Sequence, residues 1–417
     1  MKRFLSTVIP QSIKNLYHLM QAMSACLYYG FPGRKIQIIG VTGTNGKTTT
    51  TQLIARILEQ SGRKVAVAST INFQIGEKKW VNSSKFTTLS AWKLQKFLRE
   101  AVDISCEYAV IETSSHALDQ NRVWGVPYAL AVMTNVTREH LDYHKTMAEY
   151  RKAKKQLFRI AKRAVVNLDM DEPEYFSTKE KNQTLFYSTK DRNAHLFAER
   201  IELDFDNTEF VCDDVHFRIH LPGLFNVENA LAALGVARLL DIDFSIAKEA
   251  LAHVQVIPGR MELVKNTFGI DIIIDYAVTP DSFEKLYESV LPLQIPGTKI
   301  IHVFGACGDR DRGKRPIMGE IATSNADIII LTNEDPFSED PEQILDDIEK
   351  GIIKKKEKNY FRIFDRREAI KKSLSLAEIG DIVLITGKGA EETMAIGEER
   401  IVWNERQAIE EELKKRI

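Results

Sequence analysis

The sequence predicts an α/β protein with two successive domains, each built around a largely parallel sheet. Short runs of β-branched residues alternate with helical runs, and a glycine-rich loop follows the first of these strands. A Pro-Gly pair within Val256–Glu262 interrupts the pattern before a second series of strands and helices begins. We therefore expect an N-terminal helical segment at 1–34, a central domain at 35–256 and a C-terminal domain at 257–417.

The elements follow in a regular order. Lys35–Val41 predicts a buried strand, and Thr48–Gln60 predicts a helix because its apolar residues recur at helical spacing. Residues 196–221 alternate between apolar and polar, which indicates a small antiparallel insertion, and Asn226–Leu240 predicts a helix. Further strands are predicted at Lys64–Ala68, Tyr108–Glu112, Ala129–Thr134 and Ala164–Asn167, and in the second, Rossmann-like α/β domain at Lys299–Phe304, Asp327–Thr332 and Asp381–Thr386.

Composition excludes several classes of protein. Lys plus Arg number 57 and Asp plus Glu number 58 among 417 residues, so no overall charge attracts nucleic acid or acidic membranes. The apolar stretch from Leu16 to Phe31 is too short and too polar to span a bilayer. We expect a cytoplasmic monomer with no stable membrane insertion and with reduced thiols. The widely spaced cysteines are Cys26, Cys106, Cys212 and Cys307.

A glycine-rich loop, GTNGKT at 43–48, lies between the first predicted strand and its helix. Backbone N–H groups of such a loop surround phosphate oxygens, and the helix N-terminus adds partial positive charge. Lys47 would neutralise the β- and γ-phosphates of ATP, and the Thr48 hydroxyl would hold Mg²⁺. Val41 stands where the standard motif has glycine, so an ordinary strand-to-helix turn is the alternative. The loop favours ATP binding and a central domain of the P-loop ATPase type.

Polar residues downstream extend this candidate site. Glu112 ends a predicted strand, where a carboxylate can ligate Mg²⁺, although an ordinary surface acid is the alternative. His140 and His144 are four residues apart and could share a helix face as metal ligands, or could instead be loop and capping residues. Lys154 lies among other lysines, a pattern that by itself indicates a solvated helix face.

Together these residues resemble the Mur ligase family, the ATP-dependent amide-forming ligases of peptidoglycan precursor synthesis. The resemblance is greatest to the branch that adds the third amino acid to UDP-N-acetylmuramoyl-L-alanyl-D-glutamate, and it covers the chain from about Tyr28 onward. The matching strings occur in the family's order. They are GVTGTNGKTTT at 40–50, ETSSHALDQNRV at 112–123, TNVTREHLDYH at 134–144, EYRKAKKQLF at 149–158, GLFNVENALAA at 223–233, PGRMELV at 258–264, FGACGDRDRGKRP at 304–316, TNEDPFSEDP at 332–341 and GKGAEE at 387–392.

The resemblance implies a role for each matched residue. Lys47 and Thr48 would bind ATP and the first Mg²⁺, with Glu112 as a metal ligand. His140 would ligate a second Mg²⁺. Lys154 would carry a CO₂-derived carbamate that also binds metal. The implied ATP contacts are Gly43, Thr44, Asn45, Gly46, Lys47, Thr48, Thr49, Asn226, Asn229, Arg260 and Asp275. Implied contacts to the muramoyl-peptide are Thr87, Thr88, Ser114, Gln120 and Arg122. The implied amino-acid site is Arg310, Glu334, Asp335, Phe337, Gly387 and Glu391.

The family's chemistry is acyl activation. The carboxylate of the muramoyl-peptide attacks the γ-phosphate of ATP to give an acyl phosphate, and the amine of the incoming amino acid then displaces phosphate. Catalysis would rest on positioning and on charge stabilisation by two cations and Lys47. Closure of the last domain onto the central one would bring the reactants together.

Two departures from the family pattern concern substrates. About 35 residues precede the first predicted strand, too few for the family's uridine-binding domain, so we expect those contacts to be missing and leave open a UDP-linked or a lipid-linked acceptor. Phe337 replaces an arginine that reads the distal carboxylate of meso-diaminopimelate. The remaining acids, Glu334, Asp335 and Glu391, favour a basic L-amino acid such as lysine or ornithine. The alternative is that Glu334 and Asp335 only cap the helix beginning near Pro341.

Two histidines of the family pattern are also absent, since Val278 and Ala390 occupy their positions. Their loss could slow turnover, but Lys47, Glu112, His140 and Lys154 are all present, which favours an active enzyme.

Several other functions compete with this one. Folylpolyglutamate synthase and the ligase half of cyanophycin synthetase share the architecture, but Ser114, Gln120 and Arg122 follow the muramoyl branch. The others are a non-catalytic ATP-switched binding protein and a plain P-loop NTPase.

Overall fold

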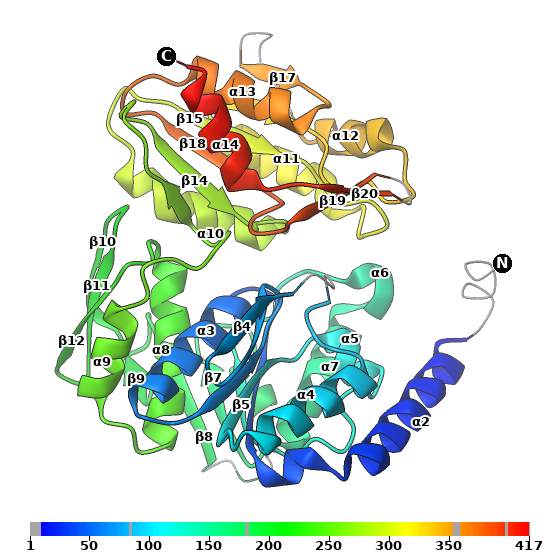
Figure 1. The fold of residues 1–417 in the computed structure, drawn as a ribbon. Helices are drawn as coiled ribbons and strands as arrows, with labels where there is room; N and C mark the ends of the chain where they lie inside the picture. The colour runs from blue at the N-terminus through cyan, green and yellow to red at the C-terminus, as the bar shows by residue number, and fades with distance from the viewer. Residues whose placement is uncertain are drawn as a thin grey trace.

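A computed structural model describes residues 10–82, 86–178, 180, 183–352, 359–396 and 399–416. These residues form two α/β bodies, a central body and a C-terminal body, drawn one above the other in Figure 1. Helix α2 (Gln11–Tyr29) lies on the outside of the central body, where it packs against α4 (Ala91–Asp103). The predicted α/β fold class is therefore confirmed. Residues 1–9 of the expected N-terminal segment lie outside the described residues.

The central sheet has the strand order β4-β3-β2-β5-β1-β6-β7-β8-β9. Neighbouring strands from β2 through β9 run parallel, while β3 and β4 form an antiparallel hairpin at one edge. The strands are β1 (Gln37–Thr42), β2 (Val65–Ala68), β3 (Asn72–Ile75), β4 (Lys78–Val81), β5 (Tyr108–Glu112), β6 (Tyr128–Met133), β7 (Arg163–Asn167), β8 (Thr184–Ser188) and β9 (Leu196–Phe197).

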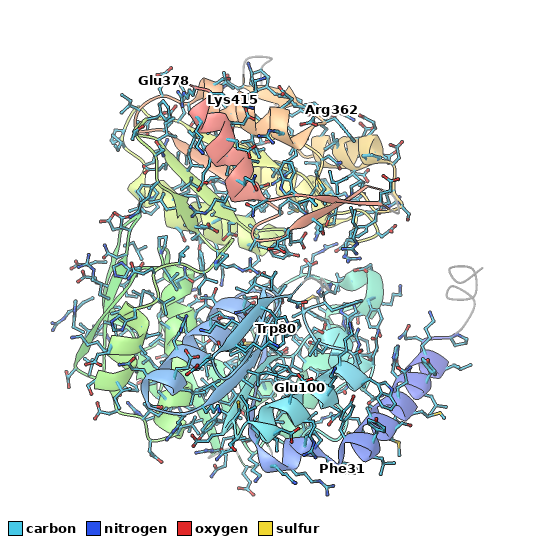
Figure 2. All side chains as sticks on the ribbon, in the orientation of Figure 1. Phe31, Trp80, Glu100, Arg362, Glu378 and Lys415 are labelled. Atoms are coloured by element: carbon cyan, nitrogen blue, oxygen red, sulfur yellow. The ribbon has the colours of Figure 1, made fainter. Side chains whose placement is uncertain are left out.

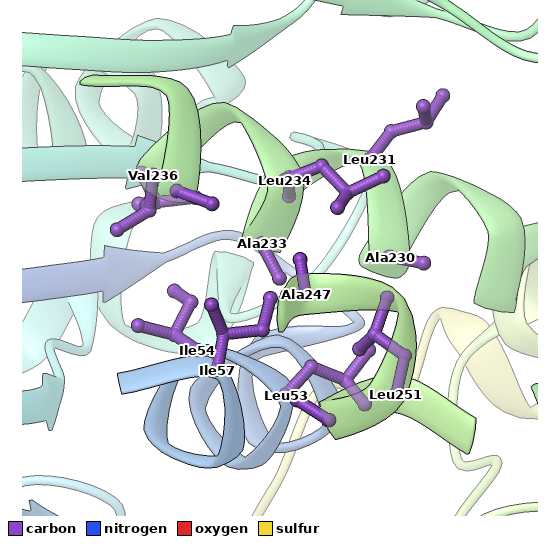
Figure 3. Close-up of a cluster of buried hydrophobic side chains, with 14 of the residues drawn as sticks. Leu53, Ile54, Ile57, Ala230, Leu231, Ala233, Leu234, Val236, Ala247 and Leu251 are labelled. Carbon is purple, nitrogen blue, oxygen red and sulfur yellow. The ribbon is translucent and has the colours of Figure 1, made fainter. Parts of the chain in front are cut away.

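Helices cover both faces of this sheet, as its apolar strands require. One face carries α3 (Lys47–Gln60), α8 (Leu224–Leu239) and α9 (Phe244–Ala252). Figure 3 shows Leu53 and Ile57 of α3 lying against side chains of α8 and α9, among them Ala233 and Leu251. The opposite face packs against α4, α5 (Ser115–Asp119) and α7 (Met147–Ile160). Shorter elements are η1 (Pro32–Lys35), α6 (Leu141–His144) and η2 (Pro173–Phe176).

The predicted antiparallel insertion is confirmed. Strands β10 (Glu199–Leu203), β11 (Thr208–Cys212) and β12 (Val215–Ile219) form a separate antiparallel sheet. Phe210 and Phe217 are paired across β11 and β12 with ring centroids 5.2 Å apart, and both side chains are buried in the core shared with α8 and α9.

The C-terminal sheet has the order β13-β14-β18-β15-β16-β17, with β13 antiparallel to an otherwise parallel set. Its strands are β13 (Glu262–Val264), β14 (Asp271–Asp275), β15 (Ile300–Phe304), β16 (Ile328–Leu331), β17 (Tyr360–Arg362) and β18 (Ile382–Thr386). The elements around it are α10 (Pro280–Val290), η4 (Leu291–Leu293), α11 (Lys314–Asn325), α12 (Pro341–Glu349), α13 (Arg366–Leu376), α14 (Glu405–Lys414) and the hairpin β19 (Thr393–Ile396) and β20 (Glu399–Val402). Across the described parts of the chain, every helix is too short or too polar to cross a membrane.

Candidate active site

The phosphate loop connects β1 to α3 in the middle of the central sheet. Gly46 is the N-cap of α3 and has φ +80°, a conformation that favours glycine. A Cβ added to Gly46 would lie 2.3 Å from Asn229 Oδ1, so the loop passes α8 too closely for a side chain. Asn229 Oδ1 also accepts a hydrogen bond from Thr50 Oγ1 at 3.2 Å, and Asn229 Nδ2 donates to Asn226 Oδ1 at 3.1 Å. Asn229, one of the predicted ATP contacts, therefore lies directly behind the loop, with Asn226 bonded to it.

Lys47 folds back onto its own loop. Its Nζ donates to the carbonyl oxygens of Gly43 at 3.0 Å and Thr44 at 2.7 Å. Burial lowers the pKa of the Lys47 ammonium, although the carboxylate of Glu112 opposes this shift. Thr48 and Thr49 are buried in the first turn of α3, where their hydroxyls are within the loop region.

Glu112 closes β5 and is completely buried. Its carboxylate accepts hydrogen bonds from Thr70 N at 2.8 Å and from Thr70 Oγ1 at 2.9 Å. Its backbone carbonyl accepts from Thr88 Oγ1 at 2.8 Å, and Thr88 Oγ1 in turn accepts from Ser114 N at 2.9 Å. The alternative of a surface acid is therefore wrong. The contacts link the predicted metal ligand to two residues of the predicted acceptor site.

The other predicted acceptor contacts continue this network. Arg122 Nε donates to Gln120 Oε1 at 2.8 Å, and Arg122 Nη1 donates to the carbonyl of Thr88 at 3.3 Å. Gln120 Nε2 donates to the Tyr143 hydroxyl at 3.2 Å, which joins the network to the histidine segment. Thr87 precedes Thr88 and is half-buried.

His140 does not share a helix face with His144. It precedes α6 as its N-cap in a left-handed conformation, with φ 58°, while His144 is the last residue of that short helix. His144 Nε2 lies 3.0 Å from Ser115 Oγ, and the His116 ring lies 4.7 Å from the ring of His140 and 5.3 Å from that of His144. Burial, reinforced by His116 and nearby cations, holds the pKa of His140 well below its usual value, so its imidazole is neutral and able to bind a metal.

Lys154 is buried, with only 1% of its surface exposed, so the interpretation of a solvated helix face is wrong for this residue. Its Nζ donates to the carbonyl of Gly43 at 2.7 Å and lies 4.6 Å from the centroid of the Tyr150 ring. Burial, together with the charge of Lys47, holds the pKa of Lys154 well below its usual value. Its neutral amine is the form that can react with CO₂.

These side chains fit a magnesium site of mixed chemistry. Among the described residues, no three His, Cys, Asp or Glu side chains gather closely enough to hold a metal by themselves. A cation here would need other oxygen donors, which a threonine hydroxyl and a carbamate would supply. The candidate donors are Thr48, Glu112, His140 and Lys154 as its carbamate.

Residues of the C-terminal body reach the loop. Asn45 Nδ2 donates to Asp281 Oδ2 at 2.6 Å, and Arg260 Nη2 lies 3.5 Å from Thr48 Oγ1. Asp275 accepts from Met261 N at 2.8 Å, and burial raises the pKa of its carboxyl. Asp281 lies in the first turn of α10, where its sequence context indicates only the start of a helix. Its contact with the loop was therefore not predicted from sequence.

The predicted amino-acid site is more balanced in charge than expected. Lys388 Nζ donates to Asp335 Oδ1 at 2.9 Å and to Glu391 Oε2 at 2.5 Å, so this lysine, which sequence reasoning missed, offsets two of the three acids. Glu334 Oε1 accepts from Cys307 Sγ at 2.9 Å, while its buried Oε2 has no hydrogen-bond partner among the residues that the structure describes. Burial raises the pKa of the Glu334 carboxyl.

Of the remaining predicted residues, Gly387 lies beside Glu334, and Arg310 and Phe337 lie against each other. A Cβ added to Gly387 would lie 2.7 Å from Glu334 Oε2, and the Arg310 guanidinium lies 5.5 Å from the centroid of the Phe337 ring. The capping alternative is wrong, because Asp340 is the residue that caps α12, through its bond to Glu342 N.

Two family models match most of the chain. A family model of the Mur ligase middle domain matches residues 41–237, and one of the Mur ligase glutamate ligase domain matches 259–389. The chain belongs to the Mur ligase family. It is thus an ATP-dependent amide-forming ligase of the family that builds peptidoglycan precursors.

Two named relatives align with most of the chain. The UDP-N-acetylmuramoyl-L-alanyl-D-glutamate–2,6-diaminopimelate ligase of Clostridium tetani is 38% identical over 396 residues, covering 94% of this chain and 80% of the relative. The enzyme of the same name from Caldanaerobacter subterraneus is 40% identical over 395 residues, with the same coverage of 94% and 80%.

Solved structures agree on the Mur ligase fold. The structure of a UDP-N-acetylmuramoyl-L-alanyl-D-glutamate–2,6-diaminopimelate ligase aligns with a TM-score of 0.62 at 33% identity, covering 91% of this chain and 79% of that one. Folylpolyglutamate synthase from Mycobacterium tuberculosis, complexed with ADP, aligns with a TM-score of 0.70 at 16% identity, covering 88% and 91% of the two chains. The second likeness shows a shared fold and nothing about substrate.

Proposed function

We propose that this Mur ligase joins an amino acid to UDP-N-acetylmuramoyl-L-alanyl-D-glutamate through an acyl phosphate. The observation that carries the proposal is that Lys47 and Lys154 both donate to the carbonyl of Gly43, with Glu112 and His140 near enough for their charges to interact with Lys47 and with Arg260 arriving from the C-terminal body. The named relatives, which act on this acceptor, support it.

The chain's own residues divide the work of the reaction. Lys47 leaves the carbonyls of Gly43 and Thr44 to bind the β- and γ-phosphates, while Arg260 closes over the nucleotide from the other body. Thr88, Ser114 and the Arg122 guanidinium hold the muramoyl-peptide so that its carboxylate faces the γ-phosphate. Mg²⁺ at the donors named above would offset the negative charge that develops on the phosphate oxygens.

We also propose a carbamate on Lys154. The neutral amine attacks CO₂, a nitrogen–carbon bond forms as one carbon–oxygen π bond of CO₂ breaks, and a proton passes from the nitrogen to water, which leaves an anionic carbamate at the end of the side chain. We expect a ¹³C NMR signal from a carbamate when the protein is equilibrated with ¹³CO₂. In Lys154→Arg the signal should disappear and the ligase activity should fall at least 100-fold. Lys152→Arg, on the same helix but exposed, should keep both.

For the incoming amino acid we propose lysine or ornithine. Phe337 cannot pair with a distal carboxylate, and the buried Glu334 Oε2, without a hydrogen-bond partner, would accept the side-chain ammonium. meso-Diaminopimelate is the second candidate, because the named relatives at 38–40% identity are diaminopimelate ligases.

The test is ATP-dependent phosphate release with this acceptor and a panel of amino acids, with products weighed by mass spectrometry. A product heavier by one lysine or ornithine residue is expected, and a preference for diaminopimelate would overturn the basic-residue assignment. Glu334→Gln should lower kcat/KM for lysine by about 10- to 100-fold, because this ratio corresponds to the free energy of a charge-assisted hydrogen bond. Glu342→Gln, on the exposed side of α12, is the matched control.

A further inference from the structure

A second cavity lies on the central body between the β3–β4 hairpin and α4. Its volume is about 320 Å³, at the lower end of the range for small-molecule sites. Figure 2 shows Trp80 on the hairpin and Glu100 on α4, two of the residues that line it. Its aromatic side chains, Phe73, Trp80 and Phe97, have no role in the candidate active site described above.

Three aromatic rings form this floor. The centroids of Phe73 and Trp80 are 5.8 Å apart, and those of Phe73 and Phe97 are 6.2 Å apart. Phe73 and Phe97 are buried, whereas 36% of Trp80 is exposed. Phe73, itself packed on Phe97, therefore supports the indole and leaves it partly accessible to a planar ring, which stacks on such a surface with little dependence on its identity.

The rim of the cavity is basic. Lys93 and Lys96 line it from α4, and Lys78 Nζ lies 5.5 Å from the centroid of the Trp80 ring. Glu100 is close to Lys96, with 3.7 Å between carboxylate oxygen and ammonium nitrogen, and offsets part of this charge. Lysine ammonium groups beside an aromatic floor suit a ligand that carries both a planar ring and phosphate.

The cavity neighbours the candidate active site. Val81 and Asn82 line both this cavity and a smaller one, about 70 Å³, that reaches Arg260, Tyr276 and Glu391 of the C-terminal body. An elongated ligand with one end on Trp80 would therefore extend toward the space between the two bodies.

We propose that the cavity beside Trp80 binds the nucleoside diphosphate end of the acceptor. The base stacks on the exposed face of Trp80, and Lys93 and Lys96 bind the diphosphate. The muramoyl-peptide then runs past Val81 and Asn82 toward Thr88 and the loop. This inference rests on the proposed function, because it takes the acceptor to be UDP-linked.

Binding of UDP to the full chain tests the proposal without the reaction. Isothermal titration would be done with saturating ADP, so that the loop is already filled. UDP should bind with a Kd at least 10-fold below those of uridine and of pyrophosphate, because stacking and charge each supply part of the affinity. The affinity for UDP should fall as NaCl is raised, while that for uridine should not.

Variants then locate the site. Trp80→Ala should raise the Kd for UDP about 10-fold or more, and Lys93→Gln with Lys96→Gln should raise it similarly and flatten the salt dependence. Trp124→Ala and Lys371→Gln, at exposed positions elsewhere, are the matched controls. Absence of saturable UDP binding, or UDP binding that these variants leave unchanged, overturns the proposal.

Steady-state kinetics separate this proposal from the proposed function. Trp80→Ala should raise KM for the UDP-linked acceptor at least 10-fold and leave kcat and KM for ATP near their original values. If product forms with the same acceptor KM in every variant, the cavity assignment fails and the ligase stands. If UDP binds at Trp80 but this acceptor gives no product, the cavity stands as a nucleoside diphosphate site and the acceptor assignment fails.

Discussion

Burial decides what a side chain can do chemically at several positions of this molecule. Lys152 and Lys154 are two residues apart on α7, yet the first is exposed and the second is completely enclosed against the phosphate loop. An exposed lysine is a hydrated cation, whereas an enclosed one loses its proton readily and becomes a nucleophile. The sequence places both in one run of lysines, so the difference becomes visible only when the loop and Tyr150 are in place.

Gly46 gives the first test at this scale. We expect Gly46→Ala to raise the Kd for ATP at least 10-fold, because the added Cβ must displace Asn229 Oδ1 and with it the back of the loop. Gly62→Ala is a close control: it has the same φ of +80°, but nothing lies within 4 Å of its Cβ. Isothermal titration with ATP would show a change in the first variant and none in the second. Equal affinities in the two variants would mean that the contact with Asn229 is irrelevant to binding.

At the level of single strands and helices, most of the buried parallel strands were predicted, although β8 and β14 were not. The strand predicted at Tyr108–Glu112 matches β5, and the other predicted strands differ from the observed ones by one or two residues at their ends. Runs of β-branched residues that are buried on both faces carry this signal. Since parallel strands end at one edge of the sheet, the position of Glu112 near the loop followed from the same pattern.

The β3–β4 hairpin was not predicted. All four residues of β4 are exposed, so the strand shows no alternation of apolar and polar residues. Contacts between residues far apart in the sequence were also not predicted, because they leave no local pattern. Lys388 and Asp335 lie on different loops, and no local pattern shows that one neutralises the other. Therefore the acidic character of the amino-acid site was overestimated from sequence.

Strand β15 carries a buried histidine that should make stability depend on pH. His302 Nδ1 lies 2.6 Å from the Tyr287 hydroxyl and Nε2 lies 3.0 Å from Thr386 Oγ1, and burial lowers its pKa from 6.5 to about 3. Between these values the unfolded chain binds a proton that the folded protein does not. The free energy of unfolding should therefore fall as pH drops below 6.5, by about 2 kcal/mol at pH 5 from this residue alone.

Urea unfolding at pH 7 and pH 5 would measure this contribution. We expect His302→Gln to lower stability at pH 7 but to show a smaller loss between the two values than the original chain. His253→Gln, at an exposed position on the end of α9, should leave the pH dependence as it was. An unaltered pH dependence in His302→Gln would show that His302 titrates normally in the folded protein.

At the scale of the whole molecule, polar contacts join the two bodies beside the packing of Phe205 and Phe225 against the C-terminal core. Asn45 bonds to Asp281, Lys314 Nζ lies 3.3 Å from Glu139 Oε1, and Lys285 lies 3.3 Å from Glu228. Interfaces of this polar kind permit the bodies to move relative to each other, as a closing enzyme requires.

Asp281 offers a test of that arrangement. Asp281→Ala removes the acceptor of the Asn45 amide, so we expect a larger radius of gyration in solution X-ray scattering and a KM for ATP raised about 3- to 10-fold. Glu288→Ala changes an exposed acid on the same helix and should change neither quantity. An unchanged scattering profile and KM in Asp281→Ala would leave this bond without a role in holding the bodies together.

The contacts of the phosphate loop also bear on how the chain is synthesised. Lys47 and its loop leave the ribosome early, but Asn229, Arg260 and Asp281, which contact that region, follow much later. Domains generally fold as units, so the loop gains its contact with Asn229 only when the whole central body has emerged, and its contacts with Arg260 and Asp281 later still. A nascent chain that stops before Asn226 therefore carries a loop that lacks all three of these partners.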